Sequence, residues 1–375
     1  MGYKDPGTQG IAAQWRHEFP VTEKLIYLNH AAVAPLPRRA ADAMQRMAED
    51  GCLHGSLHYD QWMAACDGVR SGAARLANAD ASEIAIVKNT SEGIATVALG
   101  FPWKPGDRIV AFHEEFPANY YIWKKLERSH GVRVEWLSGF DPREKVEQAV
   151  RGARFLAISF VQYLSGYRAD LEAIGAMCRR EGVFFFVDAI QGFGAFPFDV
   201  KRMQIDAFAA DGHKWMLGPE GCGVLFVSHE WQDRIEPVEF GWTNVAGWAD
   251  YASRDMTLRG DAGRYEPGTL NVIGSFGLRA SIELLLERSA EAVLAVTDRL
   301  AEGARERGYE ILGERDPAHA AGIVCIRKPG MDARLVHARL REQGILGAPR
   351  QGWVRLSPHF YISGEDAERV IASLP

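Results

Sequence analysis

The chain has 375 residues, and at about 150 residues per domain this length predicts a large domain and a smaller one. Its 43 basic and 49 acidic side chains leave a net charge of −6, which argues against a general nucleic-acid binder with a basic face. The 38 glycines exceed the usual share for a chain of this length, and they predict many tight turns or backbone held close to a ligand.

Nothing in the sequence indicates a secreted or membrane protein. The amino terminus lacks the basic start and apolar core of a secretory signal, and the apolar runs at 155–161 and 183–187 are far shorter than the ~20 residues that a membrane helix needs. The five cysteines are odd in number and form no CxxC pair, so neither a disulfide framework nor a zinc knuckle is indicated. We therefore expect a cytoplasmic enzyme with neither a membrane nor a nucleic-acid partner.

Residues 83–227 have the pattern of an α/β unit. Short runs rich in Ile, Val and Phe alternate with amphipathic stretches, which predicts a mostly parallel seven-stranded sheet flanked by helices. Helices are expected between the strands; in 170–181, for example, Leu171, Ile174 and Met177 are at helical spacing, and Gly182 is a suitable end. The expected strands are 83–88, 107–112, 132–137, 154–160, 183–187, 206–209 and 223–227.

The pattern changes after Gly268. A single long helix is predicted at 275–307, and a smaller α+β unit follows it. Ser363 and Asp366 resemble a capping pair for the last helix. We expect a large domain at 22–270 and a small α+β domain made of 1–21 and 271–375. Within the small domain the expected strands are near 309–312, 323–326 and 353–356, and the expected helices near 332–343 and 364–374.

Lys214 is the most informative residue. It stands between glycines and apolar side chains in 211–219, directly after a predicted strand, whereas a surface lysine usually has polar neighbours. Desolvation in such a setting lowers the pKa of an amine and frees it to act as a nucleophile or to form a Schiff base. The alternative is a lysine that snorkels from the end of a strand.

Asp188 ends the apolar run 183–188 and precedes Lys214 by 26 residues. Ligands of open α/β sheets bind at the carboxyl ends of the strands, so this carboxylate is expected to face the cleft. An unpaired carboxylate there is costly, and either the lysine or a protonated heterocycle would compensate it. Pyridoxal phosphate offers such a heterocycle through its ring nitrogen, whose protonation keeps the ring an electron sink. The alternative is an N-cap of the following turn.

A phosphate site is predicted where the strand 83–88 runs into a helical pattern. Thr90 and Ser91 offer two hydroxyls beside the free backbone N–H groups of a helix start, which together bind anions. Simple N-capping by either residue is the alternative.

These three segments, in this order and spacing, resemble the fold-type I pyridoxal-phosphate enzymes of aminotransferase class V, which include cysteine desulfurases, kynureninases and isopenicillin N epimerase. The resemblance extends from the motif at 27–32 to Arg355. It implies that pyridoxal 5'-phosphate is the cofactor, that Lys214 forms the internal aldimine, and that Asp188 pairs with the pyridine nitrogen.

The resemblance also implies roles for further residues. Thr90, Ser91 and His213 match phosphate-binding positions, and Gln191 matches the position next to the phenolic oxygen. Phe116 falls where relatives stack a ring on the cofactor. Arg355 matches the arginine that clamps the substrate carboxylate, for which bidentate geometry suits arginine. Other cofactor positions are Asn119 and Tyr163.

Thr269 lies in a loop that resembles one crossing a dimer interface to place a threonine on the partner's phosphate, which implies a homodimer. Asn29 and His30 are candidates for the substrate pocket, although a turn role is the alternative. His54 and His58 have the i, i+4 spacing of metal ligands, but no third ligand is evident and we predict no metal site. They are candidates instead for the pocket of the partner subunit.

The sequence departs from the cysteine desulfurases in one respect. Those enzymes need a nucleophilic cysteine on the loop before the carboxylate-binding arginine, and 344–353 contains none. Cys222 and Cys325 are expected to be small core residues. Asp211 stands where some relatives have a phosphate-binding serine, and an anion there would repel phosphate unless it faces away or pairs with protonated His213, so we leave Asp211 out of the site.

The resemblance implies an enzyme that acts on an amino acid through an external aldimine, with Lys214 as the base at Cα. Transamination is ranked narrowly ahead of β-elimination such as carbon–sulfur lysis, and racemisation or kynureninase-like cleavage follows. A sensor that binds the cofactor without turnover is the alternative outside catalysis, but no additional DNA-binding or partner module is seen. A nucleotide-binding enzyme is disfavoured because no P-loop or GxGxxG follows a predicted strand.

Overall fold

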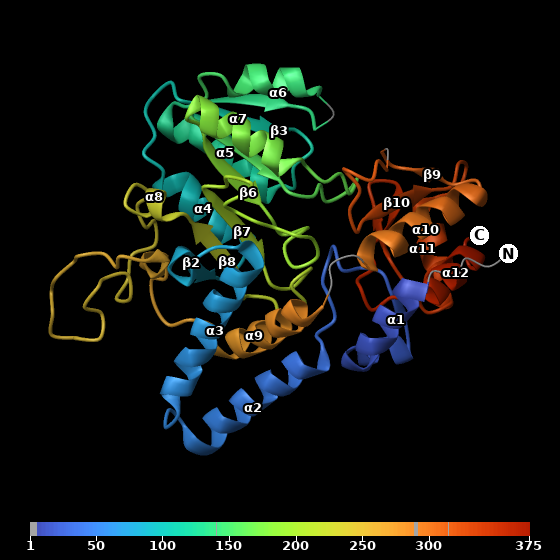
Figure 1. The fold of residues 1–375 in the computed structure, drawn as a ribbon, viewed down its shortest axis with the longest axis horizontal. Coiled ribbons are helices and arrows are strands. Elements are labelled where there is room, and N and C mark those ends of the chain that lie inside the picture. Colours follow the sequence, from blue (N-terminus) through green and yellow to red (C-terminus); the bar gives the residue numbers. More distant parts are fainter. Residues whose placement is uncertain (1–5, 140, 289–291, 314) are drawn as a thin grey trace.

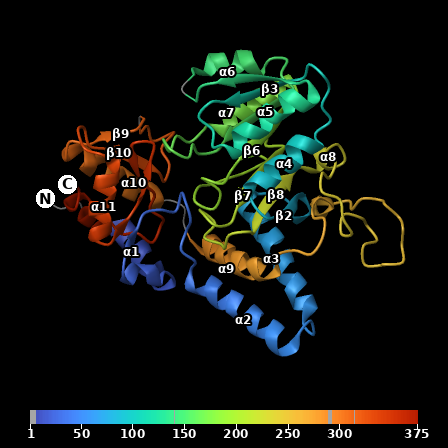
Figure 2. The ribbon, with the colours of Figure 1, turned by 180° about the vertical axis from the view of Figure 1, so that it is seen from behind.

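The structure is a computed structural model, and it describes residues 6–139, 141–288, 292–313 and 315–375. A larger α/β unit lies beside a smaller α+β unit that contains the first described helix and the carboxyl terminus (Figure 1). The first helix, α1 (Pro6–Trp15), packs against the last, α12 (Gly364–Ala372), and the view from behind shows the same arrangement (Figure 2). The predicted fold class is confirmed.

A seven-stranded sheet forms the centre of the larger unit, in the order β2-β8-β7-β6-β5-β3-β4. Only β8 is antiparallel to its two neighbours, so the sheet is mostly parallel as predicted. Each predicted strand is present, with bounds that differ by no more than two residues. The strands are β2 (Ile84–Val87), β3 (Arg108–Phe112), β4 (Arg133–Leu137), β5 (Phe155–Ser159), β6 (Phe184–Asp188), β7 (Ala207–Asp211) and β8 (Gly223–Val227).

Helices cover both faces of this sheet because alternate residues of its strands are apolar on both sides. Ile109 and Phe155 pack with residues of α4 (Thr90–Gly100) and α5 (Ala118–His130) on one face. Val110 and Leu156 belong to the core on the other face, which also contains residues of α3, α6, α7 and α9. The bounds of the remaining large-unit helices are α2 (Arg38–His54), α3 (Tyr59–Ala77), α6 (Arg143–Val150), α7 (Leu171–Glu181), α8 (His229–Gln232) and α9 (Val272–Glu287).

The single long helix predicted at 275–307 is wrong, because two helices, α9 and α10 (Ala292–Glu306), occupy this range. Arg288 has extended backbone angles (φ −102°, ψ 161°) that end α9, and residues 289–291 lie outside the described residues. Apolar periodicity continues through the break because each helix buries one face. However, α9 packs against α2 and α3, whereas α10 packs against α12 and β10 (Val324–Arg327).

The smaller unit is built on a four-stranded antiparallel sheet of order β12-β13-β10-β9. The predicted capping pair is present, since Ser363 and Asp366 form a capping box at the start of α12. Sequence analysis missed three short strands, two of which, β1 and β11, pair in parallel with each other. The bounds are β9 (Glu310–Ile311), α11 (Ala333–Glu342), β12 (Ala348–Arg350) and β13 (Trp353–Leu356), with β1 (Ile26–Tyr27) and β11 (Ile345–Leu346).

The domain boundaries at 21/22 and 270/271 stay predictions, and residues 1–5 lie outside the described part of the chain. The packing of α9 against α2 and α3 favours a boundary beyond α9 rather than before it. Four short 3₁₀ helices complete the fold, at Arg16–Glu18, Pro20–Glu23, Ala81–Glu83 and Ala262–Tyr265. Among the described helices, none combines the length and the apolar character required to cross a membrane.

Candidate active site

A cavity of about 440 Å³ lies at the carboxyl ends of β6 and β7, where open α/β sheets bind their ligands. Segments from both units of the fold contribute to its lining. The structure brings most of the predicted site residues together in this cavity. Nine of them line it: Thr90, Ser91, Phe116, Tyr163, Asp188, Gln191, His213, Lys214 and Arg355.

Lys214 lines this cavity three residues after the end of β7. Burial lowers the pKa of its amine to about 8, although the negative charge of Asp188 opposes the shift. Its Nζ atom lies 5.6 Å from the centre of the Phe116 ring. A tight turn precedes it, in which a Cβ atom on Gly212 would come within 2.5 Å of the Cys222 carbonyl oxygen. The turn is therefore packed too closely for a side chain at Gly212, and Lys214, which follows it, lines the cavity.

Asp188 is the last residue of β6 and is buried, with 2% of its surface exposed. Burial raises the pKa of its carboxyl to about 6, while the backbone N–H of Ile190, 3.1 Å away, and the charge of Lys214 act in the opposite direction. This carboxylate lines a cavity and has no basic side chain within 4.0 Å among the described residues. The protonated nitrogen of a ring fits that place electrostatically.

The first turn of α4 forms one end of the cavity. Asn89, and neither Thr90 nor Ser91, is the N-cap, since its side chain accepts a hydrogen bond from Glu92 N at 2.9 Å. The capping alternative for Thr90 and Ser91 is therefore wrong. The helix N-terminus favours an anion, and the two hydroxyl-bearing residues line the same space.

Close packing fixes this helix start against the sheet. Thr90 Oγ1 accepts a hydrogen bond from Asp211 N at 3.0 Å, which ties α4 to the end of β7. A Cβ atom on Gly93 would lie 2.7 Å from the Cβ atom of Ala209, so only glycine allows this approach without a shift. The sequence thus positions the candidate phosphate site through one hydroxyl and one glycine.

His213 and Asp211 form a pair at the same end of the cavity. His213 Nδ1 lies 3.1 Å from Asp211 Oδ2, an ion pair when the imidazole is protonated. Asp211 Oδ1 is buried and has no hydrogen-bond partner among the described residues. Asp211, which sequence analysis left out, lines the cavity beside His213. When His213 is protonated, its positive charge compensates that of Asp211, so the carboxylate does not exclude a phosphate from this end of the cavity.

Arg355 enters the cavity from β13 of the smaller unit. Its Nη1 atom donates to the Tyr163 carbonyl oxygen at 2.7 Å, and its Nε atom is buried with no hydrogen-bond partner among the described residues. Burial lowers the pKa of its guanidinium to about 10. Arg350, which sequence analysis missed, also lines the cavity from the end of β12. A substrate carboxylate fits the unused donor of Arg355.

Gln191 lines the cavity, but the protein engages both ends of its amide. Its Nε2 atom donates to the Ala31 carbonyl oxygen at 3.0 Å, and its Oε1 atom accepts from Trp215 Nε1 at 2.8 Å. The Phe116 and Tyr163 rings also line the cavity and meet edge to face, with their centres 5.4 Å apart.

Four predicted site residues lie outside this lining. His30 is fully buried between the Ser357 carbonyl oxygen and the Tyr361 hydroxyl, at 2.8 and 2.7 Å, and burial lowers its pKa to about 4. The residues after Asn29 and His30, which are Ala31 and Ala32, line the cavity in their place. The other two are Asn119, buried on α5 with its Oδ1 bonded to Trp123 Nε1, and Thr269.

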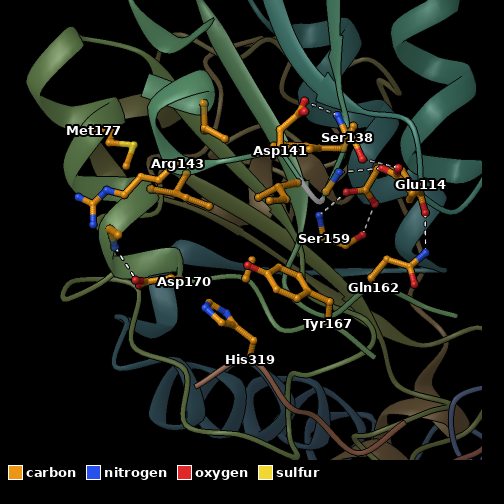
Figure 3. Close-up of a pocket in the computed structure, with 18 residues that line it drawn as sticks. Glu114, Ser138, Asp141, Arg143, Ser159, Gln162, Tyr167, Asp170, Met177 and His319 are labelled. Carbon is orange, nitrogen blue, oxygen red and sulfur yellow. Dashed lines mark hydrogen bonds between the residues drawn. The ribbon is translucent and has the colours of Figure 1, made fainter. Parts of the chain in front are cut away.

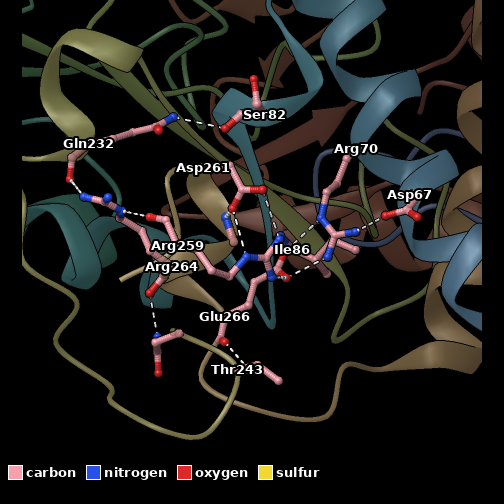
Figure 4. Close-up of polar contacts among 12 residues, drawn as sticks. Asp67, Arg70, Ser82, Ile86, Gln232, Thr243, Arg259, Asp261, Arg264 and Glu266 are labelled. Carbon is pink, nitrogen blue, oxygen red and sulfur yellow. Dashed lines mark hydrogen bonds and ion pairs between the residues drawn. The ribbon is translucent and has the colours of Figure 1, made fainter. Parts of the chain in front are cut away.

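Thr269 lines a different hollow, beside the end of β2 and the segment 239–241. A buried network anchors the loop that precedes it (Figure 4). Glu266 accepts hydrogen bonds from Arg70 on α3, at 2.6 and 3.1 Å, and from Ile86 N on β2, at 2.8 Å. Glu266 thus connects the Thr269 loop with the strand that leads into the candidate phosphate helix.

His54 and His58 both face one carboxylate on α2. Their Nδ1 atoms lie 3.1 and 2.7 Å from Asp50 Oδ1, and Trp62 Nε1 donates to Asp50 Oδ2 at 2.8 Å. Asp50, His54 and His58 could each offer one ligand atom to a cation. The expectation that there is no metal site here therefore stays a prediction. Their predicted place in a partner's pocket also stays a prediction.

Comparison with known proteins gives one consistent class. The aminotransferase class-V family model matches residues 26–352. A protein named probable cysteine desulfurase from Pyrococcus abyssi is 30% identical over 96% of each chain, and one named uncharacterized aminotransferase YcbU from Bacillus subtilis is 26% identical over 96% of each. The apo structure of a cysteine desulfurase from Thermococcus onnurineus NA1 superposes with a TM-score of 0.88 and 28% identity, covering 96% of each chain.

This fold, with a lysine, a buried carboxylate and a helix N-terminus around one cavity, defines a fold-type I enzyme that uses pyridoxal phosphate. The chain belongs to the aminotransferase class-V family. The predicted family, the predicted cofactor and the prediction of an enzyme are confirmed, and the non-catalytic sensor is disfavoured. Lys214, Asp188, His213 and the first turn of α4 are the residues whose donors and acceptors fit the cofactor.

Proposed function

We propose that this enzyme cleaves the carbon–sulfur bond of a sulfur-containing amino acid by β-elimination, and that it does so without a persulfide-forming cysteine of its own. The observation that supports this most is the state of its cysteines beside an otherwise complete site. The names of its cysteine desulfurase relatives favour a sulfur-containing substrate. The proposal reverses our narrow sequence-based preference for transamination.

The segment before Arg355, residues 344–353, contains no cysteine. Cys325 pairs with Arg355 in the neighbouring strand, but it is fully buried and its Sγ atom donates to the Leu164 carbonyl oxygen at 3.0 Å. Burial raises the pKa of its thiol to about 12, so its thiolate is scarce at neutral pH. Sulfur released in this cavity therefore meets no available thiol among its lining residues.

Arg355 and Lys214 have different roles toward the substrate: Arg355 binds it and Lys214 transfers its protons. The Arg355 guanidinium binds the α-carboxylate and orients the amino acid so that its Cα–H bond faces Lys214. When bound, the cofactor supplies an electron sink for the carbanion that forms at Cα. The ionised carboxylate of Asp188 would keep a proton on the ring nitrogen of the cofactor. This role explains why a carboxylate stands at the end of β6.

The bond changes balance without an external oxidant. Lys214 Nζ takes the proton from Cα, the electron pair forms the Cα–Cβ double bond, and the Cβ–S bond breaks with its electrons leaving on sulfur. The leaving thiolate receives a proton from the protonated Lys214. Addition of water to the released unsaturated amine then yields pyruvate and ammonia.

Product analysis tests this proposal. With L-cystine or L-cysteine as substrate, we expect pyruvate and ammonia in equal amounts, and Lys214→Ala is expected to abolish both. Alanine as the main carbon product would instead indicate desulfuration, and an α-keto acid formed only when an amino acceptor is present would indicate transamination. Transamination is the second candidate, because the relative YcbU is named an aminotransferase.

We also propose a homodimer in which Thr269 reaches the partner's phosphate site. Thr269 does not line the Lys214 cavity of its own chain, and Glu266 anchors its loop; both observations support this proposal. Light scattering of the cofactor-loaded protein that detects only monomer would contradict it.

A further inference from the structure

A second cavity of about 410 Å³ lies at the carboxyl ends of β3, β4 and β5. The helices α6 and α7 border it, and His319 of the smaller unit closes one side. Glu114, Ser138 and Gln162 lie on one side of this cavity, and Met177 and Arg143 on the opposite side (Figure 3). The volume is within the range of small-molecule sites, and its lining shares no residue with that of the Lys214 cavity.

The two cavities share one wall, built from two pairs of consecutive residues. Glu115 lines the second cavity and Phe116 lines the Lys214 cavity. Likewise Gln162 lines the second cavity and Tyr163 the Lys214 cavity. The two segments are tied together, since Gln162 Nε2 donates to the Glu114 carbonyl oxygen at 2.7 Å. The second cavity is therefore a separate space rather than an extension of the first.

The walls of the second cavity are apolar and partly aromatic. Tyr167 and the ring of His319 stack with their centres 4.8 Å apart on one side. The face of such a ring attracts a cation and packs against an apolar body. The floor consists of aliphatic and thioether side chains, among them Ile158, Ile174 and Met177.

The charged groups of the second cavity are mostly acidic. Of its four carboxylates, Asp141 alone forms an ion pair in the part of the chain that the structure describes, with Lys145 at 2.9 Å. The other three, Glu114, Glu115 and Asp170, accept hydrogen bonds from neutral donors only.

Those neutral donors leave the charges of Glu114 and Asp170 uncompensated, whereas burial raises the pKa of Glu115 to about 7 and keeps it partly protonated near neutral pH. Glu114 accepts from Gly139 N at 2.8 Å, and Asp170 accepts from Ala173 N at 3.0 Å as the N-cap of α7. The one arginine of the lining, Arg143, is largely exposed and lies 3.6 Å from Glu147, which is outside the lining. An occupant with a positive charge is therefore favoured over a neutral or anionic one.

We propose that this second cavity is a binding site for a small organic cation, namely a protonated amine attached to an apolar body of about the size of one aromatic ring. The aliphatic lining and the Tyr167 ring bury the body, and the ammonium lies beside Glu114, which Figure 3 shows on the side of the cavity opposite Asp170. The site is distinct from the amino-acid site, which has a lysine and two arginines in its lining.

Calorimetric titration of the cofactor-loaded, full-length protein tests this proposal. The probe is N,N-dimethylbenzylamine, a tertiary amine that cannot form an imine with the cofactor, and N,N-dimethylbenzamide is its neutral counterpart. We expect the amine to bind about twofold to fivefold more tightly than the amide, because a partly exposed charge pair contributes up to about 1 kcal/mol. No binding of the amine at millimolar concentration, or equal binding of the two probes, would overturn the proposal.

Two variants locate the binding. Ile174→Trp fills the cavity from α7 and is expected to abolish binding of the amine, whereas Leu335→Trp on the exposed surface of α11 is its control. Glu114→Gln removes the charge beside the expected ammonium, so it is expected to weaken the amine about twofold to fivefold and to leave the amide unchanged. Unchanged amine binding in both Ile174→Trp and Glu114→Gln would show that the probe binds elsewhere.

Discussion

The Lys214 cavity and the second cavity lie side by side at one edge of the same sheet, yet their charges are opposite. The first contains three basic side chains, Lys214, Arg350 and Arg355, and two carboxylates, whereas the second contains four carboxylates and a single arginine. The wall segments are turns in which neighbouring residues face different spaces, so Phe116 and Tyr163 line the first cavity and Glu115 and Gln162 line the second. One sheet edge can therefore separate an anion-binding space from a cation-binding one.

The largest expected effect comes from removing the amine of the first cavity. Lys214→Ala should lower the rate of carbon–sulfur cleavage by at least about 100-fold, because a positioned general base contributes about that much or more. Loss of the cofactor's characteristic absorbance should accompany it. The control is Lys201→Ala, which removes an exposed lysine. A Lys214→Ala variant with unchanged turnover would contradict the assignment.

Arg355→Lys should have the next largest effect, since it keeps the charge but removes the bidentate donor pair. We expect kcat/KM for the amino-acid substrate to fall about tenfold to 100-fold, because a hydrogen bond to a charged group contributes about 1.5–3 kcal/mol. Steady-state kinetics on this variant and on Arg334→Lys, an exposed arginine of α11, measure the difference. Equal kinetics in the two variants would place the substrate carboxylate elsewhere.

The pH dependence of cofactor capture should report the lowered pKa of Lys214. The neutral amine attacks the cofactor aldehyde, and with a pKa of about 8 its neutral fraction rises about tenfold between pH 7 and pH 9. Stopped-flow absorbance of the cofactor-free protein mixed with pyridoxal phosphate should therefore give a midpoint near pH 8. A midpoint near the ordinary value of 10.5 would show that the amine is solvated.

A smaller effect is expected from Glu115 in the shared wall. Burial raises the pKa of its carboxyl from 4.5 to about 7, against the hydrogen bonds from Ser159. Its contribution to stability is therefore fully present below pH 4.5 and is lost as the pH rises through 7. Glu115→Gln should raise the melting temperature of the cofactor-free protein by a few degrees at pH 8 and change it little at pH 5. A lower melting temperature at pH 8 would contradict this.

Cys325→Ala should have the smallest effect on turnover. The thiol is buried and bonded to Leu164, so its removal is expected to change kcat by less than about twofold, although the lost packing is expected to cost some stability. Activity and thermal unfolding measured on the same sample separate the two consequences. Loss of turnover in a folded variant would indicate that Cys325 accepts sulfur.

Sequence analysis predicted the central sheet because its strands are buried on both faces and read as continuous apolar runs. Lys214 and Asp188 were predicted to meet because the carboxyl ends of parallel strands lie at one edge. The break between α9 and α10 was missed, since neither glycine nor proline marks it and both helices have an apolar face. Composition and periodicity therefore determine the layers better than their connections.

The rest of the cavity depends on contacts between distant segments. Arg350 reaches it through β12, a strand of three residues that pairs with β13. Ala31 and Ala32 line it, whereas His30 turns into the core to meet Tyr361, 331 residues later in the sequence. No local pattern indicates which of adjacent residues faces the cavity in such a loop. For the same reason, the second cavity could not be predicted from the sequence.

The intact mass of the protein during turnover tests most directly whether sulfur is released rather than stored. The full-length, cofactor-loaded enzyme would be quenched by acid while it forms pyruvate from L-cystine or L-cysteine, and its mass would be measured without reduction. We predict the mass of the unmodified chain once the cofactor is removed. A stoichiometric gain of one sulfur atom on a cysteine would contradict the proposed elimination and indicate a persulfide-forming desulfurase.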